Sequence, residues 1–190
     1  TGRRTERIAE VVDAIGARGG TAHGLRLDET DPASIESCLE EVTEQHGVPQ
    51  ILVNNAGIPD AARAHKMSLE LVDAVLDTNV RGPWLMATGL ARRLIAARLP
   101  GRIVNISSMS AYHYGGDGAA LYSTSKAAVV RMTEALAVEW ARHLINVNGI
   151  APGVFESEMT DGMLERVGDI APGLPRKRLG LPEQLDSTLL

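Results

Sequence analysis

Residues 51–57 read ILVNNAG, an apolar run that ends in two amides and a glycine. Two later runs have the same form, GRIVNISS at residues 101–108 and INVNGIAPG at residues 145–153. Short apolar runs that end in small or polar residues are typical of buried strands, and helix-length stretches separate them here. Strands that alternate with helices in this way predict an α/β fold with a parallel sheet.

The stretches around these runs predict further elements. Residues 5–18, 68–98 and 120–143 have helical patterns, residues 22–28 look like one more strand, and residues 154–178 look irregular.

A further helix is predicted to begin after Asp31, a good N-cap, because Pro32 suits the first helical position and Gly47 suits the end.

Composition places the chain among ordinary globular proteins. Its 190 residues are 44% hydrophobic with a formal net charge of −5, which predicts one domain over residues 1–190 with a substantial core. No apolar run is long enough to cross a membrane, and Lys and Arg form no dense stripe for nucleic acid. The five His residues have no metal-ligand spacing, and a single cysteine, Cys38, fits a reducing compartment. We therefore expect a cytoplasmic protein with no metal, membrane or nucleic-acid partner.

Tyr122 and Lys126 form the most informative pair in the sequence. Residues four apart on a helix have adjacent side chains. A free phenol titrates near pH ~10, and a neighbouring ammonium lowers its pKa, so the pair suits a phenol that exchanges protons with a substrate oxygen. The plainer alternative is an ordinary solvated helix face.

Ligands of parallel sheets bind beyond the carboxyl ends of the strands. Asn54, Gly57, Ser108, Pro152 and Gly153 all fall at such ends, so the sequence predicts a ligand site there.

The chain resembles the short-chain dehydrogenase/reductase family along essentially its whole length. The motifs and residues that match the family are NNAG at 54–57, Asn79, Ser108, the Tyr122–Lys126 pair, and Pro152 with Gly153. The resemblance implies a doubly wound, Rossmann-like sheet in a single domain. It also implies an NAD(P)(H)-dependent oxidoreductase that interconverts a ketone or other carbonyl and a secondary alcohol by hydride transfer.

The same resemblance implies that the chain is truncated at both ends. No G-x-x-x-G-x-G or G-x-G-x-x-G motif occurs, although such glycines let backbone N–H groups approach a pyrophosphate. We expect the first strand with its glycine-rich loop, and the last strand, to be missing from this chain.

The resemblance assigns catalytic roles to four residues. Tyr122 is the general acid or base, and Lys126 lowers its pKa and holds the nicotinamide ribose. Ser108 hydrogen-bonds the substrate oxygen, with Ser107 and Ser110 as competitors. Asn79 offers a backbone carbonyl to a relay water, because Pro83 has no N–H to bond it; the alternative is a simple helix kink at Gly82-Pro83.

For the cofactor we predict NADP, with NAD as the alternative. By the resemblance, Gly2 stands at the position where an acidic residue selects NAD in the family. Arg3 follows it, and an arginine guanidinium can bind a phosphate through two N–H groups; Arg4 is the second candidate. By resemblance Asp28 meets the adenine. The remaining predicted cofactor contacts are Asn54, Ala56, Gly57, Tyr122, Lys126, Pro152, Gly153, Phe155 and Ser157.

The predicted substrate contacts are His113, Tyr114, Met159 and Met163, the last two in a lid formed by residues 154–178. The helix over 120–143 has two apolar stripes, one of them with Val130 and Leu144, which together with the resemblance implies a homodimer or homotetramer.

Two other functions stay open at this point. A lyase or isomerase on the same scaffold uses Ser108 and Tyr122 without net redox change, and a non-catalytic binding or oligomerisation module uses neither. A serine hydrolase is disfavoured because Gly-x-Ser-x-Gly is absent.

Overall fold

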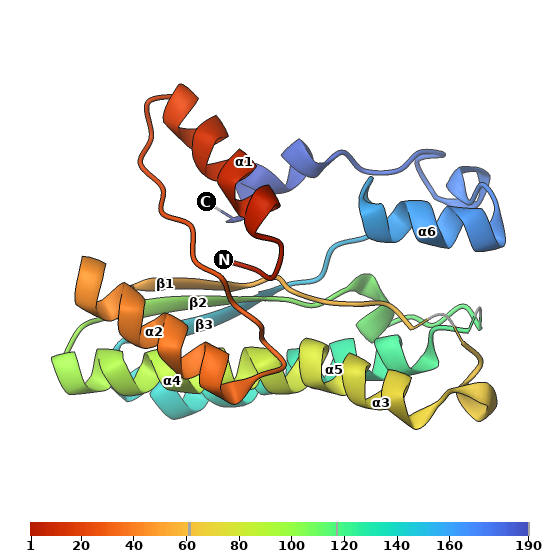
Figure 1. Ribbon diagram of the computed structural model, residues 1–190. Helices are drawn as coiled ribbons and strands as arrows, with labels where there is room; N and C mark the ends of the chain where they lie inside the picture. The colour runs from red at the N-terminus through yellow and green to blue at the C-terminus, as the bar shows by residue number, and fades with distance from the viewer. Residues whose placement is uncertain (61, 117, 190) are drawn as a thin grey trace.

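A three-stranded parallel sheet organises the part of the chain that the structure describes. The computed structural model describes residues 1–60, 62–116 and 118–189 (Figure 1). Its strands are β1 (Ile51–Asn54), β2 (Gly101–Ile106) and β3 (Ile145–Ile150), in the order β1-β2-β3. The three predicted strands are confirmed. The small and polar residues that follow each strand, such as Asn55, Ser107 and Pro152, lie together at the carboxyl end of the sheet.

Helices cross from strand to strand and cover one face of the sheet. α3 (Leu69–Leu76) and α4 (Gly82–Ala97) connect β1 to β2, and α5 (Ala120–Trp140) connects β2 to β3. Figure 1 shows α2 (Pro32–His46), α3, α4 and α5 together on the same side of the sheet. The core lies between these helices and the strands. Its most deeply buried side chains include Leu90, Leu94, Ile103, Leu136 and Ile145.

Burial alternates along the strands because successive side chains point to opposite faces. Ile103, Ile145 and Val147 face the covered side, whereas Ile51 and Val53 on the other face are 62% and 39% exposed. α1 (Thr5–Ala17) lies beyond this open face in Figure 1 and buries none of its residues. Within the described residues, close packing is therefore confined to one face of the sheet.

The predicted helix over 68–98 contains a π turn at Asp77–Arg81. Gly82 donates its N–H to the carbonyl of Asp77, five residues back, and Pro83 has no N–H to restore the normal ladder. The break in the helix that the sequence predicts at Gly82-Pro83 thus takes the form of a π turn. A Cβ on Gly82 would lie 2.8 Å from the carbonyl oxygen of Glu29, so glycine allows the segment before α2 to approach the kink.

The helix predicted after Asp31 is confirmed at both ends. The Asp31 carboxylate accepts from the N–H of Ala33, Pro32 opens α2, and Gly47 ends it at a φ of 82°. α2 buries Ile35, Cys38 and Leu39 against the core.

The predicted strand over residues 22–28 is wrong. Only an isolated bridge joins Gly2 to Arg26, with one bond from the N–H of Leu27 to the carbonyl of Gly2 at 2.8 Å. A strand needs a neighbouring backbone along its length, and in the described residues only Gly2 lies alongside. The segment instead runs as an extended connection from α1 to α2 (Figure 1).

The expectation of an irregular segment over 154–178 is also wrong in part. It contains α6 (Glu158–Val167), capped by the Ser157 hydroxyl, which accepts from the N–H of Thr160 at 3.2 Å. Glu158 and Asp161 lie in its first turn, where acidic side chains favour a helix. Ser157 therefore caps this helix, and its predicted contact with the cofactor stays a prediction. The chain ends in a short 3-10 turn (Pro182–Leu185) and α7 (Asp186–Leu189).

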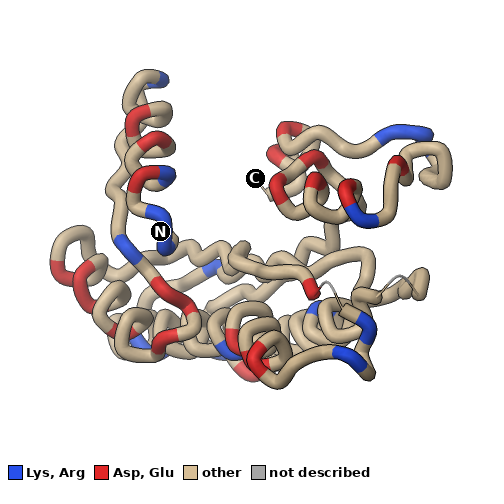
Figure 2. Tube along the Cα trace, turned by 45° about the vertical axis from the view of Figure 1, so that its right-hand side comes forward, with Lys and Arg blue, Asp and Glu red and all other residues tan. Residues whose placement is uncertain are grey.

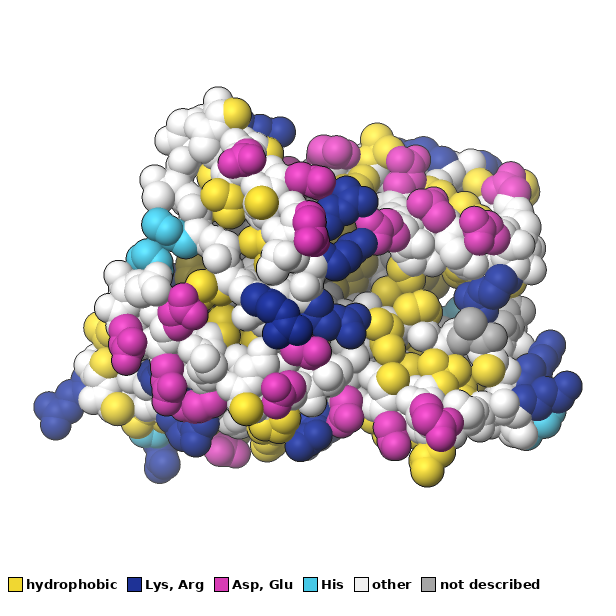
Figure 3. All heavy atoms as spheres, in the orientation of Figure 1, with side chains coloured by type: hydrophobic (Ala, Val, Ile, Leu, Met, Phe, Trp, Pro, Cys, Tyr) yellow, Lys and Arg dark blue, Asp and Glu magenta, His cyan; other side chains and the backbone are white. Residues whose placement is uncertain are grey.

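Charges are interspersed over the surface. Figure 2 shows acidic and basic residues following one another along α1. Figure 3 shows basic side chains grouped around the start of α1, where Arg3, Arg4 and Arg7 lie in the sequence. None of the described helices combines the length and the apolar character that a membrane crossing requires.

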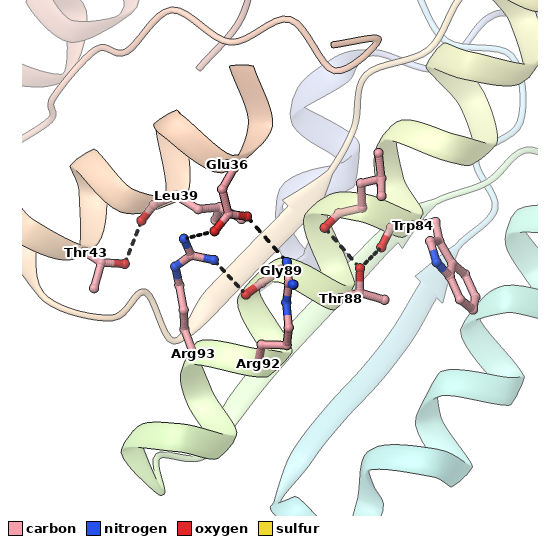
Figure 4. Close-up of polar contacts among 9 residues, drawn as sticks. Glu36, Leu39, Thr43, Trp84, Thr88, Gly89, Arg92 and Arg93 are labelled. Carbon is pink, nitrogen blue, oxygen red and sulfur yellow. Dashed lines mark hydrogen bonds and ion pairs between the residues drawn. The ribbon is translucent and has the colours of Figure 1, made fainter. Parts of the chain in front are cut away.

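One ion-pair network joins α2 to α4 (Figure 4). The Oε1 of Glu36 accepts from Arg93 at 2.7 Å and Oε2 from Arg92 at 3.4 Å, while Arg93 also donates to the carbonyl of Gly89. The Arg93 side chain is only 16% exposed. Its hydrogen bond holds the pKa of the Glu36 carboxyl below the usual value.

We expect Glu36→Gln to lower the free energy of unfolding by less than about 1 kcal/mol at neutral pH, because the half-exposed carboxylate is screened by water. The pKa of the Glu36 carboxyl is lower in the folded protein than in the unfolded chain, where it is about 4.3. The ionised carboxylate therefore stabilises the fold above pH ~4.3, and this stabilisation is lost as the pH falls through the folded-state pKa. Denaturant unfolding of both proteins at pH 7 and at about pH 3 measures this. Glu40→Gln, exposed on the same helix, is the control. An equal difference at both pH values would contradict the prediction.

Candidate active site

Tyr122 and Lys126 lie on one face of α5 at the carboxyl end of the sheet. Lys126 is only 4% exposed, and its Nζ donates to the carbonyl of Ile106, the last residue of β2, at 2.9 Å. The Nζ lies 5.7 Å from the centre of the Tyr122 ring. The i, i+4 spacing therefore places the phenol and the ammonium together beside the end of β2.

Ser108 is the serine beside the phenol. The Ser108 hydroxyl acts on the Tyr122 phenol and lowers its pKa, and it accepts from the N–H of Ser110 at 3.1 Å. Ser107 instead donates its hydroxyl to the Lys126 carbonyl at 2.8 Å, which ties β2 to α5. Of the three serines that the sequence left in competition, the geometry favours Ser108.

Asn79 fastens the loop after β1 to α5. Its buried amide accepts from the N–H of Ile58 at 2.8 Å and donates to the Ile58 carbonyl at 2.9 Å and to the Ser125 hydroxyl at 3.0 Å. This side-chain role was not predicted from the sequence. A relay water on the Asn79 carbonyl stays a prediction.

A cavity of about 290 Å³ lies beside the ends of the strands. Four of the predicted cofactor contacts line it, namely Arg3, Asp28, Ala56 and Gly57. The Asp28 carboxylate accepts from the N–H and the hydroxyl of Thr30, and these bonds hold its pKa below the usual value. The wall also includes residues that the sequence analysis missed, among them Glu29, Asn55 and Thr78.

Asn54 does not line this cavity. Its side chain is buried on the covered face, where it donates to the Asn105 Oδ1 at 2.8 Å, and Asn105 donates in turn to the Thr133 hydroxyl at 2.9 Å. Asn55, the next residue, points to the cavity because side chains alternate along a strand. Counting this alternation from Leu52 would have distinguished the two asparagines.

The other predicted contacts lie outside this cavity. The Pro152 carbonyl accepts from the N–H of Met109, which places Pro152 next to Ser108, and Gly153 has the Met109 sulfur nearby. Phe155 forms an isolated bridge with Gly180. The predicted substrate contacts are spread over two segments: His113 and Tyr114 are exposed in the loop after β2, and Met159 and Met163 lie on α6.

Burial dominates the electrostatics of the pair. It raises the pKa of the Tyr122 phenol, and the hydrogen bond with Ser108 acts in the opposite direction. It lowers the pKa of Lys126 to about 8, opposed by the carboxylate of Glu29. The expectation that Lys126 lowers the phenol pKa is therefore not met in this structure, because a lysine with a pKa of about 8 is already neutral at the pH where the phenol titrates.

The parallel sheet, the crossover helices and the polar strand ends define a Rossmann-like α/β protein. A family model described as short chain dehydrogenase matches residues 1–167. The chain belongs to the short-chain dehydrogenase/reductase family.

Two relatives illustrate the similarity. A sorbitol dehydrogenase of Cereibacter sphaeroides is 38% identical over 161 residues, which are 83% of this chain and 61% of that protein. A 2-dehydro-3-deoxy-D-gluconate 5-dehydrogenase of Dickeya dadantii is 35% identical over 179 residues, which are 93% of this chain and 70% of that protein. The chain thus spans about three fifths to seven tenths of the length of these two relatives.

Solved structures agree with this assignment. A short-chain type dehydrogenase/reductase from Mycobacterium marinum has a TM-score of 0.94 at 35% identity and covers 98% of this chain, which covers 74% of that one. A gluconate 5-dehydrogenase from Burkholderia cenocepacia, in complex with NADP and tartrate, has a TM-score of 0.89 at 28% identity. It covers 98% of this chain, which covers 73% of that one.

Proposed function

We propose that the protein is an NAD(P)(H)-dependent oxidoreductase that interconverts a ketone and a secondary alcohol. The observation that carries this proposal is the partly buried Tyr122 phenol, beside Ser108 and close to Lys126, at the strand ends near the cavity. Relatives named as sorbitol and gluconate-type dehydrogenases favour a hydroxyl-rich substrate.

The residues around the cavity fit a nicotinamide dinucleotide. On the cavity wall, the Arg3 guanidinium suits the ribose of the cofactor, phosphorylated or not, and the Asp28 carboxylate is an acceptor that suits the adenine base. Gly57 leaves open the approach to Lys126, since a Cβ there would lie 3.2 Å from the Lys126 Nζ. The cofactor, when bound, supplies or accepts the hydride.

Side chains of this chain transfer the proton to or from the substrate oxygen and stabilise the negative charge that develops on it. Tyr122 gives its phenol proton to the substrate oxygen in reduction and takes one back in oxidation. The Ser108 hydroxyl donates to the same oxygen, where negative charge develops. Lys126 is a cation near neutral pH, because its pKa is about 8, and it holds the ribose side of the cofactor next to the phenol.

The proposal extends to the parts around the site. Residues 154–178, with α6, act as the lid over the substrate, which His113 and Tyr114 contact from the other side. One stripe of α5 is buried in the core, whereas Val138 of α5 and Leu144, which follows the helix, are exposed, so a second copy is proposed to cover these residues in a dimer or tetramer. A cytoplasmic location is proposed, and the single cysteine, Cys38, supports it.

Arg3 is the proposed contact for the 2′-phosphate of NADP. Arg4, the second candidate, forms an ion pair with Glu158 of α6 at 3.1 Å. Among the ion pairs of the described residues, Arg3 takes part in none. Its guanidinium on the cavity wall is therefore available to a phosphate.

The purified protein is expected to oxidise NADPH when a polyhydroxylated ketone is added. Arg3→Ala is expected to weaken NADPH binding about 10- to 100-fold and to change NADH binding little, because one charged hydrogen bond contributes about 1.5–3 kcal/mol. Calorimetric or fluorescence titration with each nucleotide measures this, and Arg18→Ala at the end of α1 is the control. Equal losses for both nucleotides would contradict NADP selection. A protein that binds neither nucleotide would favour the non-catalytic module.

A further inference from the structure

The N-terminus of α5 is capped by a side chain from a distant loop. Asp60 is 1% exposed, and its Oδ2 accepts from the N–H of Leu121 at 3.0 Å. The two residues are 61 positions apart in the sequence. Leu121 lies in the first turn of α5, directly before Tyr122.

α5 has no local replacement for this contact. Its own N-cap residue, Ala119, makes no side-chain bond, and its first turn contains no acidic residue. α2, α3 and α6 are each capped by their own N-cap side chains, from Asp31, Ser68 and Ser157. The first N–H groups of a helix have no partner within the helix, so the helix that carries Tyr122 depends on the loop for one of them.

The loop that contains Asp60 is also the wall of the cavity. Ala56, Gly57 and Ile58 line the cavity, and Ile58 is held through Asn79 to the hydroxyl of Ser125. The loop is therefore fastened to α5 on both sides of Tyr122, at Leu121 by Asp60 and at Ser125 by Asn79. The two fastenings fix the phenol relative to the cavity wall.

The second carboxylate oxygen of Asp60, Oδ1, is in an energetically unfavourable environment at the N-terminus of α5. Oδ1 is buried and has no hydrogen-bond partner among the described residues. A buried acceptor without a partner is unfavourable, whereas a negative charge at a helix N-terminus is favourable.

We propose that Asp60 is a positioning residue for Tyr122, which joins the cofactor side of the cavity to the first turn of the catalytic helix. The catalytic role of Asp60 rests on the function proposed above. The hydrogen bond by which Asp60 caps α5 does not depend on that function, and a measurement that needs no enzyme activity tests it separately.

The main experiment compares Asp60→Ala with a matched loss of a cap elsewhere. Ser68→Ala removes the bond from the Leu71 N–H to the Ser68 hydroxyl, at 3.3 Å, on α3, which carries none of the proposed catalytic residues. Both variants are expected to lower the melting temperature. Only Asp60→Ala is expected to lower kcat, by about 10- to 100-fold, because a small displacement of a reacting group is costly. The KM of the substrate is expected to change little.

Asp60→Asn tests whether the acceptor itself is responsible. The amide oxygen keeps the shape of the side chain and can still accept from the Leu121 N–H, so most of the lost kcat is expected to return. A folded Asp60→Asn protein with the same kcat loss as the alanine variant would overturn the cap as the cause. If the alanine variant does not fold, the asparagine variant is compared directly with the wild type.

Amide hydrogen exchange gives the readout that is independent of activity. Exchange at Leu121 and Tyr122 is expected to accelerate in Asp60→Ala and to stay unchanged in Ser68→Ala. This result would support the cap even if the wild-type protein reduced no ketone, so failure of the proposed function is distinguishable. Unchanged exchange in the first turn of α5, or a kcat that Asp60→Ala and Ser68→Ala lower equally, would overturn the proposal.

Discussion

Tyr122→Phe is expected to lower kcat for ketone reduction by about 10²- to 10⁴-fold, the usual contribution of a positioned general acid. The substitution removes only the hydroxyl that the ring presents to Ser108. The ring keeps its packing next to Lys126, so the melting temperature and the nucleotide affinity are expected to change little.

Steady-state kinetics of the two proteins with the same ketone and nucleotide measures this effect. The control is Tyr112→Phe, which removes the hydroxyl of an exposed tyrosine in the loop after β2 and is expected to leave kcat unchanged. If Tyr122→Phe retained full activity while bound nucleotide was consumed, the phenol would not be the acid. If no activity depended on Tyr122 at all, the non-catalytic module would become the better interpretation.

Lys126→Met is expected to change the pH dependence of stability. The pKa of Lys126 is about 8 in the folded protein and about 10.4 in an unfolded chain. Between these values the unfolded state binds more protons, so this lysine makes the wild type more stable as the pH rises from about 8 to about 10.4. Below pH ~8 the charged lysine must be buried, which lowers stability.

We therefore expect Lys126→Met to gain stability relative to the wild type at pH 7. This relative gain is expected to shrink by on the order of 3 kcal/mol as the pH rises to about 10.5, since one pKa unit corresponds to about 1.4 kcal/mol. Denaturant unfolding across this range measures it, because groups present in both proteins cancel in the difference. Lys66→Met, at an exposed position, is the control. If the difference in free energy of unfolding between the two proteins did not vary with pH, burial of the Lys126 ammonium would not lower its pKa, and the prediction would be wrong.

Local pattern predicted most of the fold. The three strands lie inside their apolar runs, α2 begins after Asp31 and ends at Gly47, and the π turn lies at the Gly82-Pro83 step. Each of these features depends on residues within a few positions of one another. The same holds for Tyr122 and Lys126, which share a helix face because of their spacing.

Features that depend on a distant partner were missed or misassigned. The segment over 22–28 has strand-forming residues, but the backbone beside it offers only Gly2. α6 was missed for a local reason, because its Ser157 cap outweighs the weak helix propensity of a segment that contains Gly162. Asn55 rather than Asn54 faces the cavity because Asn105 of β2 engages Asn54, and Ser108 rather than Ser107 faces the phenol because the Lys126 carbonyl of α5 engages Ser107.

The sequence by itself determined the three strands with the helices between them, the break before α4 and the shared face of Tyr122 and Lys126, because periodicity and backbone chemistry act over a few residues. Only the tertiary structure decided which polar groups at the strand ends meet, since those contacts join residues tens of positions apart. It brought the Asp60 carboxylate to the first turn of α5, joined Asn79 to Ile58 of the cavity wall and placed Glu29 within electrostatic reach of Lys126. Burial, which no single stretch reveals, then set the pKa of Lys126 to about 8.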